Sequence, residues 1–137
     1  MSSSTSNYHD THESKWKPLL ATGKLGGDYN LLKIYYETAL RRGVSPDKII
    51  FNSEDLYYLR VIAENSVSKD LGTVIDLLTK RFVDRIDPSA AQETIEKYLG
   101  TKIDPETAVN MIAKILAIWC IEAGESLGYI KLRDYYR

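Results

Sequence analysis

Histidine and cysteine are scarce in this chain of 137 residues, which limits the chemistry it can perform. The only two histidines, His9 and His12, stand in a polar, serine-rich stretch, so no histidine is available as a general base in a folded segment. The single cysteine, Cys120, lies in an apolar run, which predicts a buried, inert thiol and excludes a disulfide within the chain. We therefore expect a protein that is not an enzyme and that needs no cofactor.

No metal centre is expected either, although the stretch HDTHE, from His9 to Glu13, groups two imidazoles with three polar neighbours. Structural zinc sites are usually built from ligands held in folded elements, and polar tails produce such clusters by chance. Pairs of neighbouring carboxylates are not expected to be catalytic acid pairs, because solvated helix faces also display such pairs. These pairs are Glu54 with Asp55, Glu93 with Glu96, and Glu122 with Glu125.

Long apolar runs and a strong charge imbalance are also missing. The longest uncharged apolar run, 115–121, is far shorter than the roughly 20 residues that a membrane-spanning helix needs. No basic-then-apolar leader is found, so we expect a cytoplasmic protein without a membrane partner. The formal net charge of −1 argues against a surface devoted as a whole to phosphate. Gln, Met and Asn are rare, which is typical of proteins from thermophiles.

Helical periodicity begins at Asp28 and continues to the end of the chain. Apolar residues recur there at spacings of three and four, and no segment alternates as a strand between hairpin turns would. Residues 1–12 form a polar tail, and 13–27 an irregular arm whose apolar side chains must dock on something. We predict an all-α fold. It is a compact bundle of about five helices in one domain, 28–137, with the tail and docking arm in 1–27.

The helix starts are predicted from capping residues. The first helix is expected over 28–43, the second from Asn52 or Ser53 to about Ser68, and the third from Asp70 to about Arg85. Two later stretches, 85–100 and 102–117, align without a gap at an offset of 17 residues. Each contains Ile-Asp-Pro, which suits an N-cap followed by proline at the first helical position. A shared helix start explains this similarity more simply than a duplication, because solenoid repeats are usually longer and more numerous.

The last helix is predicted to begin at Pro105, to be buried nearly all round between 108 and 121, and to be able to run to the end of the chain. Small residues follow one side of it and would let another helix approach closely. This ridge consists of Ala113, Ala117, Cys120, Gly124 and Gly128. The approaching helix could belong to the same chain or to a second copy.

Basic residues gather in three places, at the ends of the first and third helices and at the end of the chain. Combined with tyrosine rings they would suit single-stranded nucleic acid. The residues are Arg41, Arg42, Lys80, Arg81, Arg85, Lys131, Arg133, Tyr135, Tyr136 and Arg137. Interleaved carboxylates can neutralise them as ordinary surface pairs, so a solvated face is favoured. The ending YIKLRDYYR is interpreted as a docked C-terminal helix that buries Ile130 and Leu132.

The leading hypothesis is a non-enzymatic helical protein that acts through protein–protein contacts or self-association, as a subunit or repeated structural component of a larger protein or nucleoprotein assembly. Its predicted interface residues are Trp16, Leu19, Leu20, Ala113, Ala117, Gly124 and Gly128. The alternative is a low-specificity nucleic-acid-binding protein that uses the cations and C-terminal tyrosines. The two are distinguished by whether the cations share one face without carboxylate partners.

Overall fold

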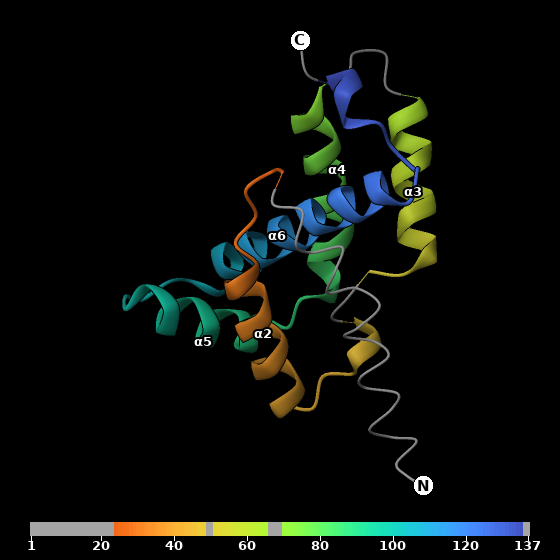
Figure 1. Ribbon diagram of the computed structural model, residues 1–137. Coiled ribbons are helices and arrows are strands. Elements are labelled where there is room, and N and C mark those ends of the chain that lie inside the picture. The colour runs from red at the N-terminus through yellow and green to blue at the C-terminus, as the bar shows by residue number, and fades with distance from the viewer. Residues whose placement is uncertain (1–23, 49–50, 66–69, 136–137) are drawn as a thin grey trace, which may run out of the picture.

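Every regular element in the computed structural model, which describes residues 24–48, 51–65 and 70–135, is a helix (Figure 1). The predicted all-α bundle is confirmed. Within the described ranges the α-helices are α2 (Tyr29–Arg41), α3 (Ser53–Glu64), α4 (Leu71–Phe82), α5 (Pro88–Leu99) and α6 (Pro105–Ser126). Short 3-10 turns are η1 (Pro46–Lys48), η2 (Val83–Arg85) and η3 (Leu132–Tyr135).

The helices begin at the capping residues that the sequence indicates. The Asp28 carboxylate accepts a hydrogen bond from the Leu31 N–H at 3.1 Å, and Asp70, Asp87 and Asp104 cap α4, α5 and α6 in the same way. Each cap satisfies one of the N–H groups that have no partner inside a helix. The predicted prolines also stand at the first positions of α5 and α6.

Two helix ends come earlier than the sequence predicted. Helix α3 ends at Glu64 with Asn65 as its C-cap, and residues 66–69 lie outside the described chain. Helix α4 ends at Phe82, and the residues expected to complete it form the tighter turn η2.

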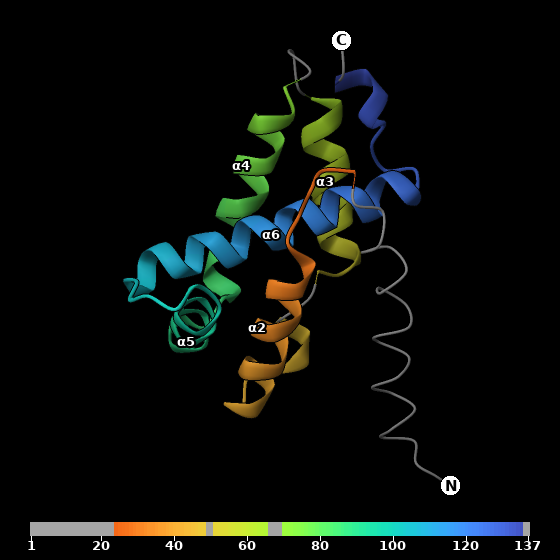
Figure 2. The same ribbon diagram turned by 60° about the vertical axis from the view of Figure 1, so that its left-hand side comes forward.

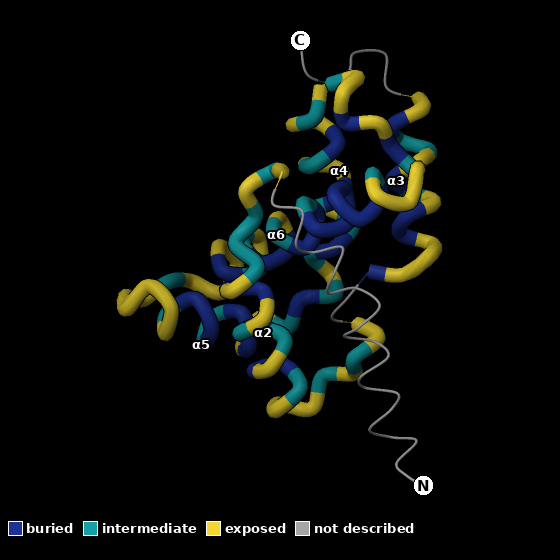
Figure 3. The backbone as a smooth tube through the Cα atoms, in the orientation of Figure 1, coloured by how far each residue is buried: buried dark blue, intermediate teal, exposed yellow. Residues whose placement is uncertain are grey.

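Helix α6 crosses the centre of the molecule. In Figure 2 it has α2 and α5 on one side and α3 and α4 on the other. A helix with neighbours on both sides has to be apolar nearly all round, as α6 is. Its Ile112, Leu116 and Ile121 have no exposed surface, and Figure 3 shows buried residues along α6 and exposed ones at the tip of α5.

Among the described helices, α6 alone is long and apolar enough to cross a membrane by length and composition. However, 61% of its apolar window is buried inside the fold. Core helices of soluble proteins have the same character, so the apolarity of α6 is explained by its central position.

The chain turns away after Ser126, so the predicted continuation of this helix to the C-terminus is wrong. Gly128 has a φ of 84°, in the left-handed region that glycine adopts without strain. The Tyr129 N–H donates to the Gly124 carbonyl at 2.7 Å, and the Gly128 N–H to the Glu125 carbonyl at 3.1 Å. These paired bonds form a Schellman ending, which satisfies carbonyl groups that the helix leaves open.

The segment after this turn packs against the core. Ile130 and Leu132 are buried, with 5% and 1% of their surface exposed, and Tyr135 is half-buried against the same core. The predicted burial of these apolar side chains is confirmed, but they belong to an irregular stretch and η3 rather than to a docked α-helix. Residues 136–137 lie outside the described chain.

Candidate functional site

The small residues of α6 pack inside the fold. Ala113 and Ala117 have no exposed surface, and a Cβ added at Gly124 would lie 2.3 Å from Cδ2 of Leu59 in α3. Gly128 lies beyond the end of α6 and is exposed. Of the residues predicted as an interface, three are therefore core residues and one belongs to a turn. At Gly124 the neighbour is the chain's own α3.

The last residues of the predicted arm lie along the C-terminal half of α6. The Leu25 N–H donates to Oε2 of Glu122 at 2.7 Å, and Nζ of Lys24 lies 2.6 Å from Oε1 of Glu125. Leu25 also packs its side chain against the core. The described end of the arm is thus docked on its own chain.

Three other apolar residues of the arm, Trp16, Leu19 and Leu20, lie outside the described part of the chain. Gly27, within it, lies against α6 at Ile118, where an added Cβ would be 3.1 Å from Cγ2. The absence of a side chain at Gly27 therefore lets the arm approach the helix closely.

Glu122 is a carboxylate with no exposed surface. Burial and the neighbouring Glu122 carboxylate raise the pKa of Tyr29, at the start of α2. Glu122 therefore stands where the arm, α2 and α6 meet.

The arginines at the end of α2 are paired with α5. Arg42 donates from Nε and Nη2 to Oε1 of Glu93 at 3.0 and 2.6 Å, and Arg41 donates from Nη2 to Oε2 at 3.2 Å. Hydrogen bonds from Arg42 and Arg41 hold the pKa of Glu93 below its usual range. Both guanidinium groups are therefore engaged with a carboxylate of the same molecule.

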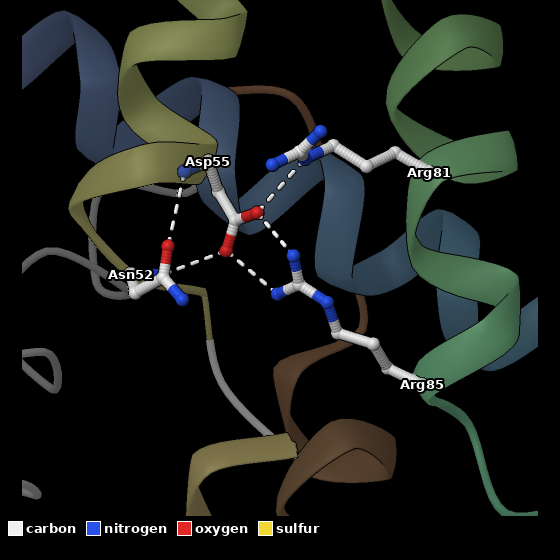
Figure 4. A network of polar contacts seen from close by, with 4 residues as sticks. All are labelled: Asn52, Asp55, Arg81 and Arg85. Carbon is white, nitrogen blue, oxygen red and sulfur yellow. Dashed lines mark hydrogen bonds and ion pairs between the residues drawn. The ribbon is translucent and has the colours of Figure 1, made fainter.

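The arginines at the end of α4 surround a buried carboxylate, Asp55 of α3 (Figure 4). Arg81 Nε donates to Asp55 Oδ1 at 2.9 Å, Arg85 Nη1 donates to Oδ2 at 2.6 Å, and Arg85 Nη2 donates to Oδ1. Asn52 and Asp55 also exchange hydrogen bonds through side chain and backbone, which caps α3. The guanidinium of Arg81 lies 4.6 Å from the ring centroid of Tyr58.

This arrangement decides the ionisation of Asp55. Burial on its own would raise the pKa, but hydrogen bonds from Arg85, the Asn52 backbone and Arg81 outweigh it, and the pKa of Asp55 is lowered. The carboxylate therefore stays charged and joins α3 to the end of α4.

Sequence reasoning missed the role of Asp55, although two signals were present. Asn52 and Asp55 have the spacing of a capping box, and Arg81 and Arg85 have the spacing that places both on one face of a helix. No local pattern reveals that these two faces meet, because α3 and α4 approach each other only in the folded chain.

The remaining predicted cations and tyrosines are spread over the molecule. Lys80 is exposed on α4, and Lys131 and Arg133 are exposed on the segment after α6. Within the described residues these three have no ion pair. Burial raises the pKa of Tyr135. The predicted Tyr136 and Arg137 lie outside the described chain.

These positions do not form the single unpaired basic face that the nucleic-acid hypothesis requires. Four of its arginines have carboxylate partners, at two separate places. Figures 1 and 2 place the segment after α6 beside the C-terminal end of α3, while η2 lies at the far end of α4.

Exposed side chains on α3 and on the turn after α6 include a tyrosine, a leucine and an arginine that lies against a second tyrosine ring. Tyr57 and Arg60 stand three residues apart on α3, and the guanidinium of Arg60 lies 5.1 Å from the ring centroid of Tyr129. Leu127, in the same turn as Tyr129, is 48% exposed, and Tyr57 is 63% exposed. We call these four residues the α3 surface.

An open hollow lies between the end of α2 and α5. Its lining is Arg42, Ser89, Gln92, Glu93, Glu96 and Lys97. Both carboxylates are engaged, Glu93 with arginines and Glu96 with the Ile103 N–H at 3.0 Å. The hollow therefore does not present the two free acids that a carboxylate-based enzyme would need.

No group of three metal-ligating side chains comes together among the described residues, and the HDTHE stretch lies outside them.

No protein-family model, curated protein or solved structure matches the chain. A function therefore has to be inferred from the geometry of the described residues.

Proposed function

We propose that this protein acts through contacts with other proteins, as a non-enzymatic helical subunit or repeated component of a larger assembly in the cytoplasm. The observation that supports the proposal is the α3 surface. Tyr57 and Leu127 keep much of their apolar area in water, and Arg60 lies against the ring of Tyr129. Tyrosine and arginine are the residues in which the energetically dominant parts of protein interfaces are enriched.

The α3 surface is not required by the packing of the fold. The core side of α3 is formed by Leu56, Leu59 and Ala63, which are buried. The exposed side carries the charged residues Glu54, Arg60 and Glu64, and among them a tyrosine that the core does not need. Burying apolar area against a partner is favourable by about 25 cal/mol per Å². A tyrosine ring supplies such area with little loss of conformational entropy.

The experiment compares the wild-type chain with Tyr57→Ser/Leu127→Ser. Both positions are exposed, so circular dichroism and the melting temperature should stay unchanged. We expect light scattering and chemical cross-linking, in pure solution and in extract of the source cells, to show loss of the assembly in this variant only.

The matched control is Leu99→Ser at the tip of α5, where the leucine is 50% exposed. This variant removes a similar apolar area from a different part of the surface and should assemble as the wild type does. A wild-type chain that is monomeric and cross-links to nothing would contradict the proposal, as would equal behaviour of the two variants.

Nucleic-acid binding is a second proposal, supported by one observation. Lys131 and Arg133 are exposed on the segment that follows Tyr129, whose ring lies against Arg60. The variant Lys131→Gln/Arg133→Gln should weaken binding to single-stranded RNA of any sequence, with a salt dependence shallower by about one unit for each lost phosphate contact. Unchanged affinity would remove this alternative.

A further inference from the structure

The charge of the buried Asp55 is balanced without Arg81. Arg85 alone donates to both carboxylate oxygens, and the Asn52 N–H donates a further hydrogen bond at 2.7 Å. Two guanidinium groups and one carboxylate leave an excess of one positive charge at this place. Among the described residues, no other carboxylate lies within ion-pair distance of either arginine. The positive charge of Arg81 therefore has to be balanced from outside the chain.

The side chain of Arg81 is nevertheless held in place. Its Nε donates to Asp55 Oδ1 at 2.9 Å, and its guanidinium lies against the ring of Tyr58, 4.6 Å from the centroid. The two terminal nitrogens, Nη1 and Nη2, have no hydrogen-bond partner among the described residues, and no dashed line reaches them in Figure 4. They are not among the buried polar atoms that lack a partner, so they reach the surface. One edge of the guanidinium is thus fixed while the other is free.

We propose that Arg81 is the binding residue of an oxyanion site, which takes a phosphate or carboxylate group. The free edge of a guanidinium presents two parallel N–H donors, which match two oxygens of such a group. Because Asp55 and Tyr58 already restrict the side chain, a ligand gains these hydrogen bonds at a smaller loss of rotamer freedom than it would at an unrestrained arginine. The site shares no residue with the α3 surface, so it goes beyond the proposed function and is tested independently of it.

Side-chain NMR of the wild-type chain tests the site. The Nε–H signals of Arg81 and Arg60 are followed while sodium phosphate replaces sodium chloride at constant ionic strength. A single contact of this kind binds weakly, so the titration covers the millimolar range. Arg60 is the matched control within the same molecule, because it also lies over a tyrosine ring but its carboxylate partner, Glu64, is exposed. We expect a saturable shift at Arg81 and none at Arg60.

A parallel titration with sodium acetate identifies the class of oxyanion. Saturation of the Arg81 signal by phosphate alone assigns the site to phosphate groups, saturation by acetate alone assigns it to carboxylates, and saturation by both assigns it to either. The absence of a saturable shift at Arg81 with both ions would overturn the proposal. Equal responses of Arg81 and Arg60 would overturn it as well, because they would show general screening rather than a site.

The variant Arg81→Lys separates the free edge from the charge, because lysine keeps the charge but has no pair of coplanar donors. The ion that saturates Arg81 should raise the melting temperature of the wild type above its value in chloride at equal ionic strength, since a ligand of the folded state stabilises it. This increase should be lost in Arg81→Lys and kept in the control Arg60→Lys. An increase that persists in Arg81→Lys would overturn the proposal. If Arg81→Lys does not fold, the wild-type titration decides alone.

Discussion

Asp55 and Glu122 are both carboxylates without exposed surface, yet they occupy opposite kinds of environment. Asp55 accepts hydrogen bonds from two guanidinium groups and connects α3 with the end of α4. Glu122 accepts the backbone N–H of Leu25 and connects the described end of the arm, residues 24–27, with α6. The first site joins two helices through opposite charges, whereas the second fixes residues 24–27, which are not part of a helix.

This difference indicates how each site responds to change. A buried ion pair that loses one partner leaves an uncompensated charge, which costs about 3–5 kcal/mol, whereas a lost hydrogen bond between a backbone N–H and a carboxylate costs about 1.5–3 kcal/mol. Changes at the Asp55 site should therefore affect the whole fold. Changes at the Glu122 site should mainly release the arm.

The largest effect is expected for Arg85→Ala. This change removes two of the three arginine hydrogen bonds to Asp55 and should lower the free energy of unfolding by about 3 kcal/mol. Urea denaturation measures it. Arg81→Ala, which removes one of the three bonds, is the matched comparison and should cost less. Equal and small losses for both variants would show that the buried charge is not held as Figure 4 depicts.

The same stabilisation should be lost in acid. Because the pKa of Asp55 in the folded protein lies below its ordinary value of 3.8, its contribution is complete above that value and decreases as the pH falls through the lower, folded pKa. Asp55→Asn should remove this part of the pH dependence. Stability curves against pH for the two proteins that remain parallel below pH 4 would contradict the assignment.

Gly124→Ala tests the point where the two regions meet. Gly124 lies two residues after Glu122 and packs against Leu59, one turn after Asp55, at a distance that a methyl group cannot fit without movement. We expect a loss of about 2 kcal/mol from overpacking, seen as a lower melting temperature. Gly72→Ala, near the exposed start of α4, is the control and should not be destabilising, because an added Cβ has 3.4 Å to its nearest neighbour.

Glu122→Gln should have a smaller and more local effect. The amide oxygen can still accept the Leu25 N–H, so we expect a loss of about 1 kcal/mol. Hydrogen exchange should show reduced protection at Leu25 and little change in α3 and α4. A loss as large as that of Arg85→Ala would mean that the arm is part of the cooperative core, and the contrast between the two sites would not hold.

The smallest effect is expected for Glu93→Gln. Its ion pairs with Arg41 and Arg42 lie at the surface, where water and salt screen charges, so the melting temperature should hardly change. A clear destabilisation that disappears at high salt would show that this pair, like Asp55, contributes to the fold.

The fold was predictable wherever the controlling interaction is local. Asp28, Asp70, Asp87 and Asp104 cap their helices as expected, since a cap binds an N–H only two or three residues away. The buried nature of α6 was also predictable, because its apolar residues surround the whole helix. The end of α6 was mispredicted. Gly128 is compatible with a continued helix and with a turn, and the burial of Ile130 and Leu132 favours the turn.

The interactions of the site residues, in contrast, could not be predicted from the sequence. Arg41, Arg42, Arg81 and Arg85 have the same appearance in the sequence as cations that bind phosphate, and only the meeting of α2 with α5 and of α3 with α4 assigns carboxylate partners to them. The α3 surface was missed as well, because it combines residues of α3 with the turn after α6, about 70 positions apart.

The sequence by itself determined which segments are helical, where most of them begin and which helix lies at the centre, because caps and apolar periodicity act over a few residues. Only the tertiary structure decided which charges are neutralised, which helix fills the small-residue side of α6, and which aromatic side chains stay in water. Those outcomes depend on contacts between distant segments, such as Gly124 with Leu59 and Asp55 with Arg85, which no local pattern encodes.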